Sequence, residues 1–145
     1  MMTAAVARRA QELTAQGAAF VTATVVRTQR PTIAEAGSVA LVLGDGTIEG
    51  FVGGVCAEHS VRAYALRALQ SGEAVLLRIL PDAEGDEADV ADGVSTEHGA
   101  VTVQNPCLSG GAIEVFLEPV LPGPRVLVVG DTPIADAVLR IGAEL

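Results

Sequence analysis

The chain is poor in aromatic residues and contains no tryptophan. Its 145 residues include three Phe and one Tyr, although half of all residues are apolar. The hydrophobic core must therefore rest on Val, Leu, Ala and Ile, with glycine allowing backbones to approach closely. This composition is typical of a sheet covered by helices, and predicts an α/β (α+β) fold with a mixed sheet and flanking helices.

Basic residues and long apolar runs are also scarce. Nine Lys and Arg stand against eighteen Asp and Glu, which gives a net charge of −9. Because nucleic-acid-binding proteins generally present a basic face, this balance argues against a nucleic-acid partner. No run is long and apolar enough to span a bilayer, and no apolar stretch follows Arg8 and Arg9 as in a signal peptide. We therefore expect a cytoplasmic protein that binds no membrane.

Only two cysteines are present, Cys56 and Cys107, and each lies within a few residues of a Gly-Gly pair. So few cysteines fit a reducing compartment, where thiols are expected rather than a disulfide. Two buried thiols acting as small hydrophobes would explain the pair without any function. A cysteine beside a glycine loop can also act as a soft ligand or a nucleophile if its thiolate is favoured.

Hydrophobic periodicity and turn residues predict alternating helices and strands. Helices are predicted at 3–16, 56–70 and 133–141. Strands are predicted at 19–28, 38–43, 47–51, 74–80, 100–104, 112–117 and 125–130. Asp45-Gly46 predicts a hairpin turn, and residues 81–99 a long acidic loop.

Three prolines between residues 119 and 124 predict a linker. Residues 1–118 then form a first domain, and residues 125–145 the start of an incomplete Rossmann-like domain, since a strand, a glycine turn and a helix open such folds. A lone strand-helix unit cannot bury both faces of its strand. We therefore expect either that the chain is truncated here or that this unit docks on the first domain or on another copy, which would make a homo-oligomer.

The first glycine-cysteine segment runs from a hairpin into a helix. Gly53 and Gly54 would expose backbone amides just before the helix, whose N-terminus favours anions such as phosphate. Cys56 would lie at the first turn, where a thiolate is stabilised. A tight turn with close packing explains the two glycines equally well, and Glu58 would then serve only to cap the helix.

The second segment holds Cys107, Ser109, Gly110 and Gly111 ahead of a strand. Its glycines would again expose amides to a ligand, and Ser109 would either donate to a ligand oxygen or close the turn. Arg27 ends the first strand, and with Arg30 it would either bind phosphate or offset an acidic surface.

A metal or catalytic site is the alternative use of the same residues. Cys56, His59, His98 and Cys107 offer zinc-ligand atom types without a Cys-x-x-Cys pair, and a Cys-His pair would suit nucleophilic catalysis. The acidic residues between 82 and 92 lack the spacing of a calcium loop, so a solvated loop is the preferred interpretation.

Four stretches together resemble the XdhC/CoxI family, the accessory proteins of molybdenum hydroxylases such as xanthine dehydrogenase and carbon monoxide dehydrogenase. They are residues 24–28, the hairpin and glycine-cysteine loop at 45–56, the second block at 107–119, and the strand at 125–130. The resemblance implies a non-catalytic maturation protein that transiently binds the molybdopterin cofactor, in bacteria often as the cytosine dinucleotide.

The same resemblance implies partners and site residues. The cofactor would be sheltered while a cysteine desulfurase-type sulfur donor supports its sulfuration, and would then be inserted into the hydroxylase large subunit. Residues expected to contact the cofactor are Arg27, Gly53, Gly54, Cys56, Cys107, Ser109, Gly110 and Gly111. Two other functions stay open: an interaction or scaffold subunit that binds no cofactor and acts through a hydroxylase or a full-length paralogue, and a cysteine-dependent or zinc enzyme.

Overall fold

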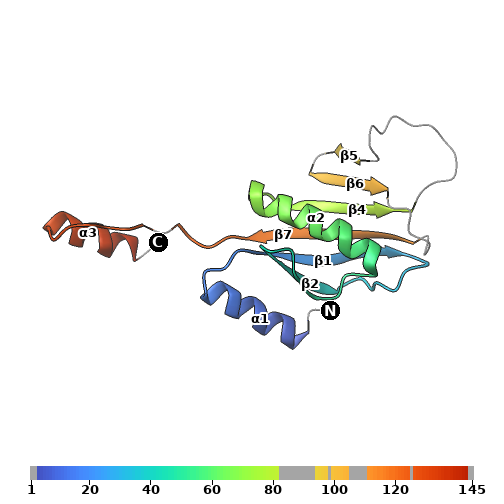
Figure 1. The fold of residues 1–145 in the computed structure, drawn as a ribbon, viewed down its shortest axis with the longest axis horizontal. Helices are drawn as coiled ribbons and strands as arrows, with labels where there is room; N and C mark the ends of the chain where they lie inside the picture. The colour runs from blue at the N-terminus through green and yellow to red at the C-terminus, as the bar shows by residue number, and fades with distance from the viewer. Residues whose placement is uncertain (1–2, 82–93, 98, 105–110, 125, 144–145) are drawn as a thin grey trace.

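The computed structural model describes residues 3–81, 94–97, 99–104, 111–124 and 126–143. They form a seven-stranded sheet in the order β3-β2-β1-β7-β4-β6-β5, with α2 lying across it (Figure 1). The helices are α1 (Ala4–Ala15), α2 (Val55–Ser71) and α3 (Pro133–Gly142). The strands are β1 (Phe20–Gln29), β2 (Val39–Leu43), β3 (Ile48–Gly50), β4 (Val75–Leu80), β5 (Val94–Glu97), β6 (Ala100–Gln104) and β7 (Ala112–Val120).

The sheet is mixed, as the sequence predicts. Strands β4 and β6 pair in parallel, whereas every other neighbouring pair is antiparallel. Because side chains alternate along each strand, every second residue of β4 and β7, and of β1 as far as Val25, faces α2. Within the described ranges, no helix is long and apolar enough to cross a membrane.

Turn and cap residues delimit the elements. Thr3 caps α1 by accepting from the amide of Val6, and Gly72 ends α2 in the left-handed conformation at φ 74°. In the β2–β3 turn, the carboxylate of Asp45 accepts from the amide of Thr47 at 2.8 Å. This hydrogen bond favours the ionised form and lowers the pKa of Asp45 below its usual value.

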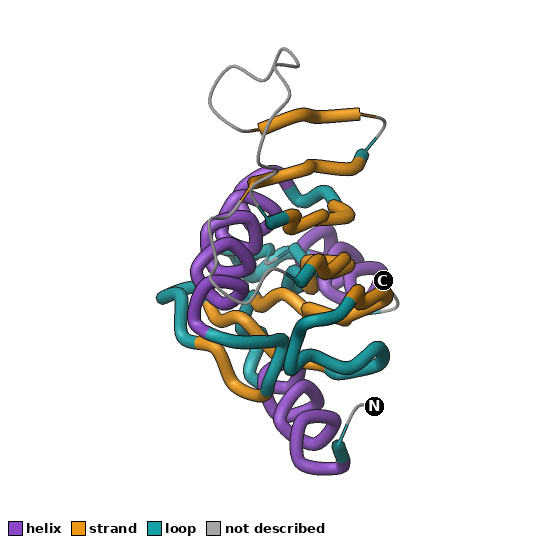
Figure 2. Tube along the Cα trace, turned by 90° about the vertical axis from the view of Figure 1, so that its right-hand side faces the viewer, coloured by secondary structure: helices purple, strands orange, loops and turns teal. Residues whose placement is uncertain are grey.

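Two apolar clusters lie on opposite faces of the sheet. The larger packs α2, through Val61, Ala65 and Ala68, against β1, β2, β4, β6 and β7. The smaller lies under α1 and joins Leu13 to Phe20 and Leu41. Figure 2 shows the sheet with α2 along one side and α1 at one end. The helices α1 and α2 are therefore each held by the burial of one apolar stripe.

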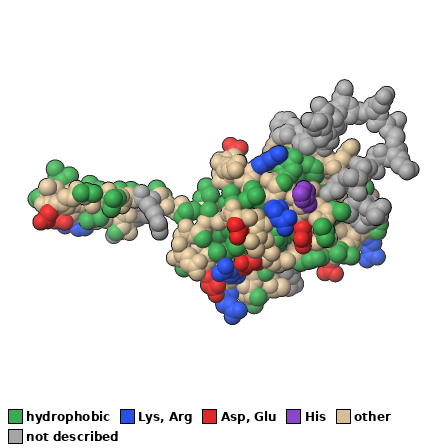
Figure 3. All heavy atoms as spheres, viewed as in Figure 1, with side chains coloured by type: hydrophobic (Ala, Val, Ile, Leu, Met, Phe, Trp, Pro, Cys, Tyr) green, Lys and Arg blue, Asp and Glu red, His purple; other side chains and the backbone are tan. Residues whose placement is uncertain are grey.

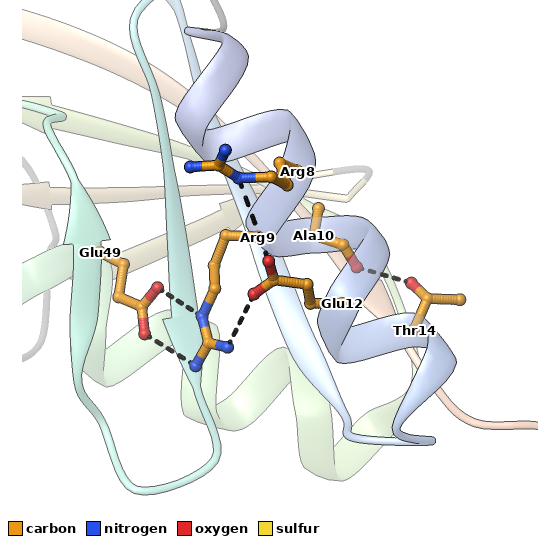
Figure 4. Close-up of polar contacts among 6 residues, drawn as sticks. All are labelled: Arg8, Arg9, Ala10, Glu12, Thr14 and Glu49. Atoms are coloured by element: carbon orange, nitrogen blue, oxygen red, sulfur yellow. Dashed lines mark hydrogen bonds and ion pairs between the residues drawn. The ribbon is translucent and has the colours of Figure 1, made fainter.

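An ion pair ties α1 to the edge strand β3. The guanidinium of Arg9 donates to both carboxylate oxygens of Glu49, at 2.9 and 3.2 Å, and to Glu12 at 3.4 Å (Figure 4). The hydrogen bonds to Glu49 raise the pKa of Arg9 above its ordinary value. The contact is bidentate, so it orients α1 on the sheet as well as neutralising charge.

Three sequence predictions need correction. The predicted acidic loop at 81–99 contains β5, while residues 82–93 lie outside the described part. Strand β7 continues through Pro119 and Val120, two residues into the predicted linker, and pairs there with β1. Residues 126–129, predicted as a strand, are not one. A strand requires a hydrogen-bonded neighbour, and among the described residues this apolar segment pairs with none.

The helix of the C-terminal unit is confirmed as α3, but its large apolar side chains are exposed, whereas Ala135 is buried. Figure 1 shows α3 apart from the sheet, and Figure 3 shows hydrophobic side chains on this unit beside charged ones. Val126, Leu127 and Val129 are between 74% and 89% exposed, and Ile134 is 76% exposed. The unit does not dock on the sheet, as Figure 1 shows, and its docking on another copy stays a prediction.

Candidate functional site

A cavity of about 960 Å³ opens at the N-terminus of α2. One wall is the loop between β1 and β2, residues 30–36, and the opposite side is formed by the first turn of α2. Ile79 and Ile113, from the α2 face of the sheet, form its apolar floor. Its size suits a ligand as large as a nucleotide or a pterin.

Three of the predicted contact residues line this cavity: Gly54, Cys56 and Gly111. The first two begin α2, and Gly111 directly precedes β7, so the structure brings together the ends of both predicted glycine segments. Cys107, Ser109 and Gly110 lie outside the described residues, and their predicted roles stay predictions.

Gly53 does not line the cavity. It is buried, with φ 140°, and an added Cβ would lie 3.0 Å from Cβ of Ala57. This backbone conformation is one that side-chain-bearing residues rarely adopt. Gly53 is therefore required for the turn into α2, whichever ligand the neighbouring cavity holds.

Gly54 is the N-cap of α2, and unlike Gly53 it can be replaced by a residue with a side chain. Its φ of −72° is open to any residue, and an added Cβ would meet only Cδ1 of Ile33, at 3.9 Å. Gly54 has no side chain with which to cap the helix. The first-turn amides and the partial positive charge of the helix dipole are at the cavity. Glu58 in the first turn offsets part of that charge.

Only glycine fits at position 111, because the backbone of the β1–β2 loop packs directly against it. An added Cβ would overlap the carbonyl of Pro31 and lie 2.9 Å from the carbonyl oxygen of Gln29. The peptide bond between Arg30 and Pro31 is cis. The second segment thus holds the β1–β2 loop against the start of β7 and shapes the cavity wall.

Arg27 lies on the other face of the sheet from the cavity, contrary to what its place at the strand end indicated. A bulge between Val25 and Arg27 shifts the register, so that Val25 opposes Val115 while Arg27 opposes Glu114. The extra residue reverses the alternation of side chains along β1. The Nη1 of Arg27 lies 3.8 Å from Oε1 of Glu114, and its side chain is 76% exposed.

The same bulge brings Thr28 to the cavity side, and Arg30 and Thr32 line the cavity from the loop that follows. Glu35 adds one carboxylate to the lining. Arg30 is exposed and makes no ion pair within the described part of the chain. The residue that could bind phosphate is therefore Arg30, three positions after Arg27. The sequence had named Arg30 beside Arg27 as a possible phosphate ligand.

Cys56 is disulfide-bonded, whereas the sequence favoured thiols. The only other cysteine of the sequence, Cys107, lies outside the described residues. His59 lies on α2, is exposed and does not line the cavity. Among the residues that the structure describes, no three His, Cys, Asp or Glu side chains gather as metal ligands.

Comparison with known proteins confirms the family resemblance. Residues 13–79 match the XdhC and CoxI family. The matched segment runs from the end of α1 to β4 and includes the β1–β2 loop and the first turn of α2. Most of the cavity lining therefore lies within it.

The fold also resembles that of a crystal structure described as a xanthine dehydrogenase from Bacillus halodurans. The TM-score is 0.52 at 20% sequence identity, and the likeness covers 95% of this chain. The chain corresponds to 34% of the other protein, about a third of its length. At this identity the likeness shows the fold alone. No curated protein matches the sequence.

Proposed function

We propose that this chain, whose residues 13–79 match the XdhC and CoxI family, is a cytoplasmic maturation factor for a molybdenum hydroxylase. It transiently binds the molybdopterin cofactor, as the cytosine dinucleotide, without catalysing a reaction of its own. The observation that carries this proposal is the cavity at the start of α2, where both glycine segments end. The whole maturation sequence includes a sulfur-donating desulfurase and the hydroxylase large subunit as partners.

The lining residues fit an anionic cofactor. The guanidinium of Arg30 would bind phosphate, the amides at Gly54 and the first turn of α2 would donate to further phosphate oxygens, and Thr28 and Thr32 would supply hydroxyl groups. The apolar floor at Ile79 and Ile113 suits a flat ring system. Glu35 and Glu58 act against this and limit the affinity.

Cys56 would contact the cofactor when the cysteine is reduced to a thiol. A thiolate at the first turn of a helix is stabilised by the helix dipole and is a soft ligand for molybdenum. When bound, the cofactor supplies the redox centre that the hydroxylase requires. The role of this chain is to hold the cofactor, orient it and keep water from it.

Replacement of Gly54 by aspartate tests this assignment with a matched neutral control, Gly54→Asn. Both side chains cap helices well and both have room, so neither should destabilise α2. Only aspartate places a negative charge at the anion site. We expect Gly54→Asp to weaken retention of molybdopterin cofactor on gel filtration by about tenfold, the value of one charge-assisted hydrogen bond, and Gly54→Asn to bind as wild type does.

The experiment is run under reducing conditions, with Cys56→Ser as a second variant. Failure of the wild-type chain to retain the cofactor would contradict the proposal. So would equal retention by Gly54→Asp and Gly54→Asn, because the cofactor would then not lie at the start of α2.

A second candidate function is an interaction or scaffold subunit without a cofactor, acting through a hydroxylase or a full-length paralogue. The exposed apolar residues of the C-terminal unit favour it, above all Leu127 at 89% and Val129 at 86% exposure. We expect the wild-type chain to sediment as a dimer or larger, and the double substitution Leu127→Asp with Val129→Asp to sediment as a monomer. A monomeric wild type at micromolar concentration would remove self-association as the role of this surface.

A further inference from the structure

We propose that the sheet face opposite α2 binds an acidic segment of a partner protein. This inference is independent of the cofactor cavity, which lies on the α2 side. The face is defined here by the cross-strand row Arg27, Glu114 and Arg78, with the flanking residues Phe116 and Leu80.

The row is set by strand register. Arg27 on β1 opposes Glu114 on β7, and Glu114 opposes Arg78 on β4. Thr102 on β6 extends the row by pairing with Arg78. Two guanidinium groups and one carboxylate thus lie side by side across three neighbouring strands, so this row carries a net charge of +1 in a chain of net charge −9. The next carboxylate on this face of β7 is Glu118, which is exposed beyond Phe116.

The single carboxylate does not satisfy both cations. Oε1 of Glu114 lies 3.6 Å from Nε of Arg78 and 3.8 Å from Nη1 of Arg27. Both distances exceed those of good hydrogen bonds to a carboxylate, about 2.7–2.9 Å. Nε of Arg78 is buried and has no hydrogen-bond partner among the described residues. A second carboxylate approaching from outside would meet the outer guanidinium nitrogens and draw both arginines into shorter contacts.

Apolar side chains flank the charged row. Phe116 and Leu80 are each 38% exposed, and Val26, at the bulge, is 47% exposed. The apolar cluster under α1 joins Leu13 to Phe20 and Leu41, at the β1–β2 end of this face. Figure 2 likewise shows α1 at one end of the sheet rather than across it. A surface of Arg and Phe beside aliphatic residues is typical of protein interfaces.

Charge complementarity selects the occupant. The two arginines require a carboxylate, and the apolar flanks require that it belong to a chain with aromatic or aliphatic neighbours. A flat sheet face offers little enclosure to a small free anion, whereas an extended acidic segment can contact all three strands. The partner is therefore a protein with glutamate or aspartate next to apolar residues.

The probe is a short fluorescent peptide of glutamate alternating with phenylalanine and leucine, with a glutamine version as its control. Binding is followed by polarisation and by the NMR signals of the arginine Nε–H groups in the full chain. We expect the glutamate peptide to bind and to shift the Arg27 and Arg78 signals. Arg27→Gln and Arg78→Gln should each weaken binding by about fivefold, as for other partly exposed charge pairs.

Arg67→Gln is the matched control, because Arg67 is an exposed arginine on α2 that lies over the ring of Tyr64 at 4.8 Å. It should leave binding unchanged. Arg27 is mostly exposed, so its variant tests the site even if Arg78→Gln unfolds. Equal binding of the glutamine peptide, or equal weakening by Arg67→Gln, would overturn the proposal. So would inorganic phosphate shifting the same signals as tightly as the peptide, or self-association of the chain that Arg78→Gln abolishes.

Discussion

Replacing Gly111 with alanine is expected to destabilise the protein by about 3 kcal/mol, at the upper end of the usual cost of overpacking. The new Cβ would overlap the carbonyl group of Pro31, with the carbonyl carbon only 2.6 Å away, and would lie 2.9 Å from the carbonyl oxygen of Gln29. These are backbone atoms, so no side chain can rotate to relieve the contact. The β1–β2 loop would have to move away from β7, and the cavity wall would move with it.

Urea denaturation of the Gly111→Ala variant measures this effect, and Gly44→Ala is the matched control. Gly44 lies in the β2–β3 turn, where an added Cβ meets nothing within 4 Å. The free energy of unfolding of the Gly44→Ala control should stay within about 0.5 kcal/mol of the wild-type value, as it usually does for surface substitutions. Equal stability of the two variants would show that the loop does not pack on Gly111. Loss of cofactor retention in Gly111→Ala alone would link the loop position to the cavity.

Replacing Leu77 with alanine is the other change of large expected effect, also about 3 kcal/mol. Leu77 is fully buried on β4 and belongs to the cluster under α2. It opposes Val115 on β7 and Val101 on β6, both of which are buried. The substitution removes three carbon atoms and leaves a cavity that the paired strands cannot close, because their hydrogen bonds hold their spacing.

Leu80→Ala is the control for Leu77→Ala on the same strand. Leu80 is 38% exposed and faces away from α2. The Leu80→Ala substitution should lower the free energy of unfolding by about 1 kcal/mol or less, because Leu80 is only partly buried. Thermal and urea unfolding of both variants measure the difference. If Leu80→Ala were as destabilising as Leu77→Ala, the assignment of the core to the α2 face would be wrong.

Local structure was predictable where single residues dictate it. The Thr3 cap, the Asp45-Gly46 turn and the left-handed Gly72 each follow from the conformations that one residue type favours. The helices and most strands followed from apolar periodicity alone. The strand predicted at 125–130 was wrong because strand formation requires a neighbour, and the local pattern does not contain one.

The candidate site was predictable only in part. Gly54 and Cys56 were found because a glycine pair ahead of a helix identifies a helix N-terminus. Gly111 was predicted for its amide, but its close packing on Pro31 is a contact between segments about eighty residues apart. Such a contact has no local signal.

By itself, the sequence determined the helices, the hairpin, the family resemblance and the two glycine segments, because each depends on residues that are near one another in the chain. Only the tertiary structure decided which side chains share a face. One inserted residue beside Val25 reverses the alternation of β1, so that Thr28 faces the cavity and Arg27 lies on the other face, beside Glu114. A bulge is set by the pairing of two strands, and pairing is decided only when the sheet assembles.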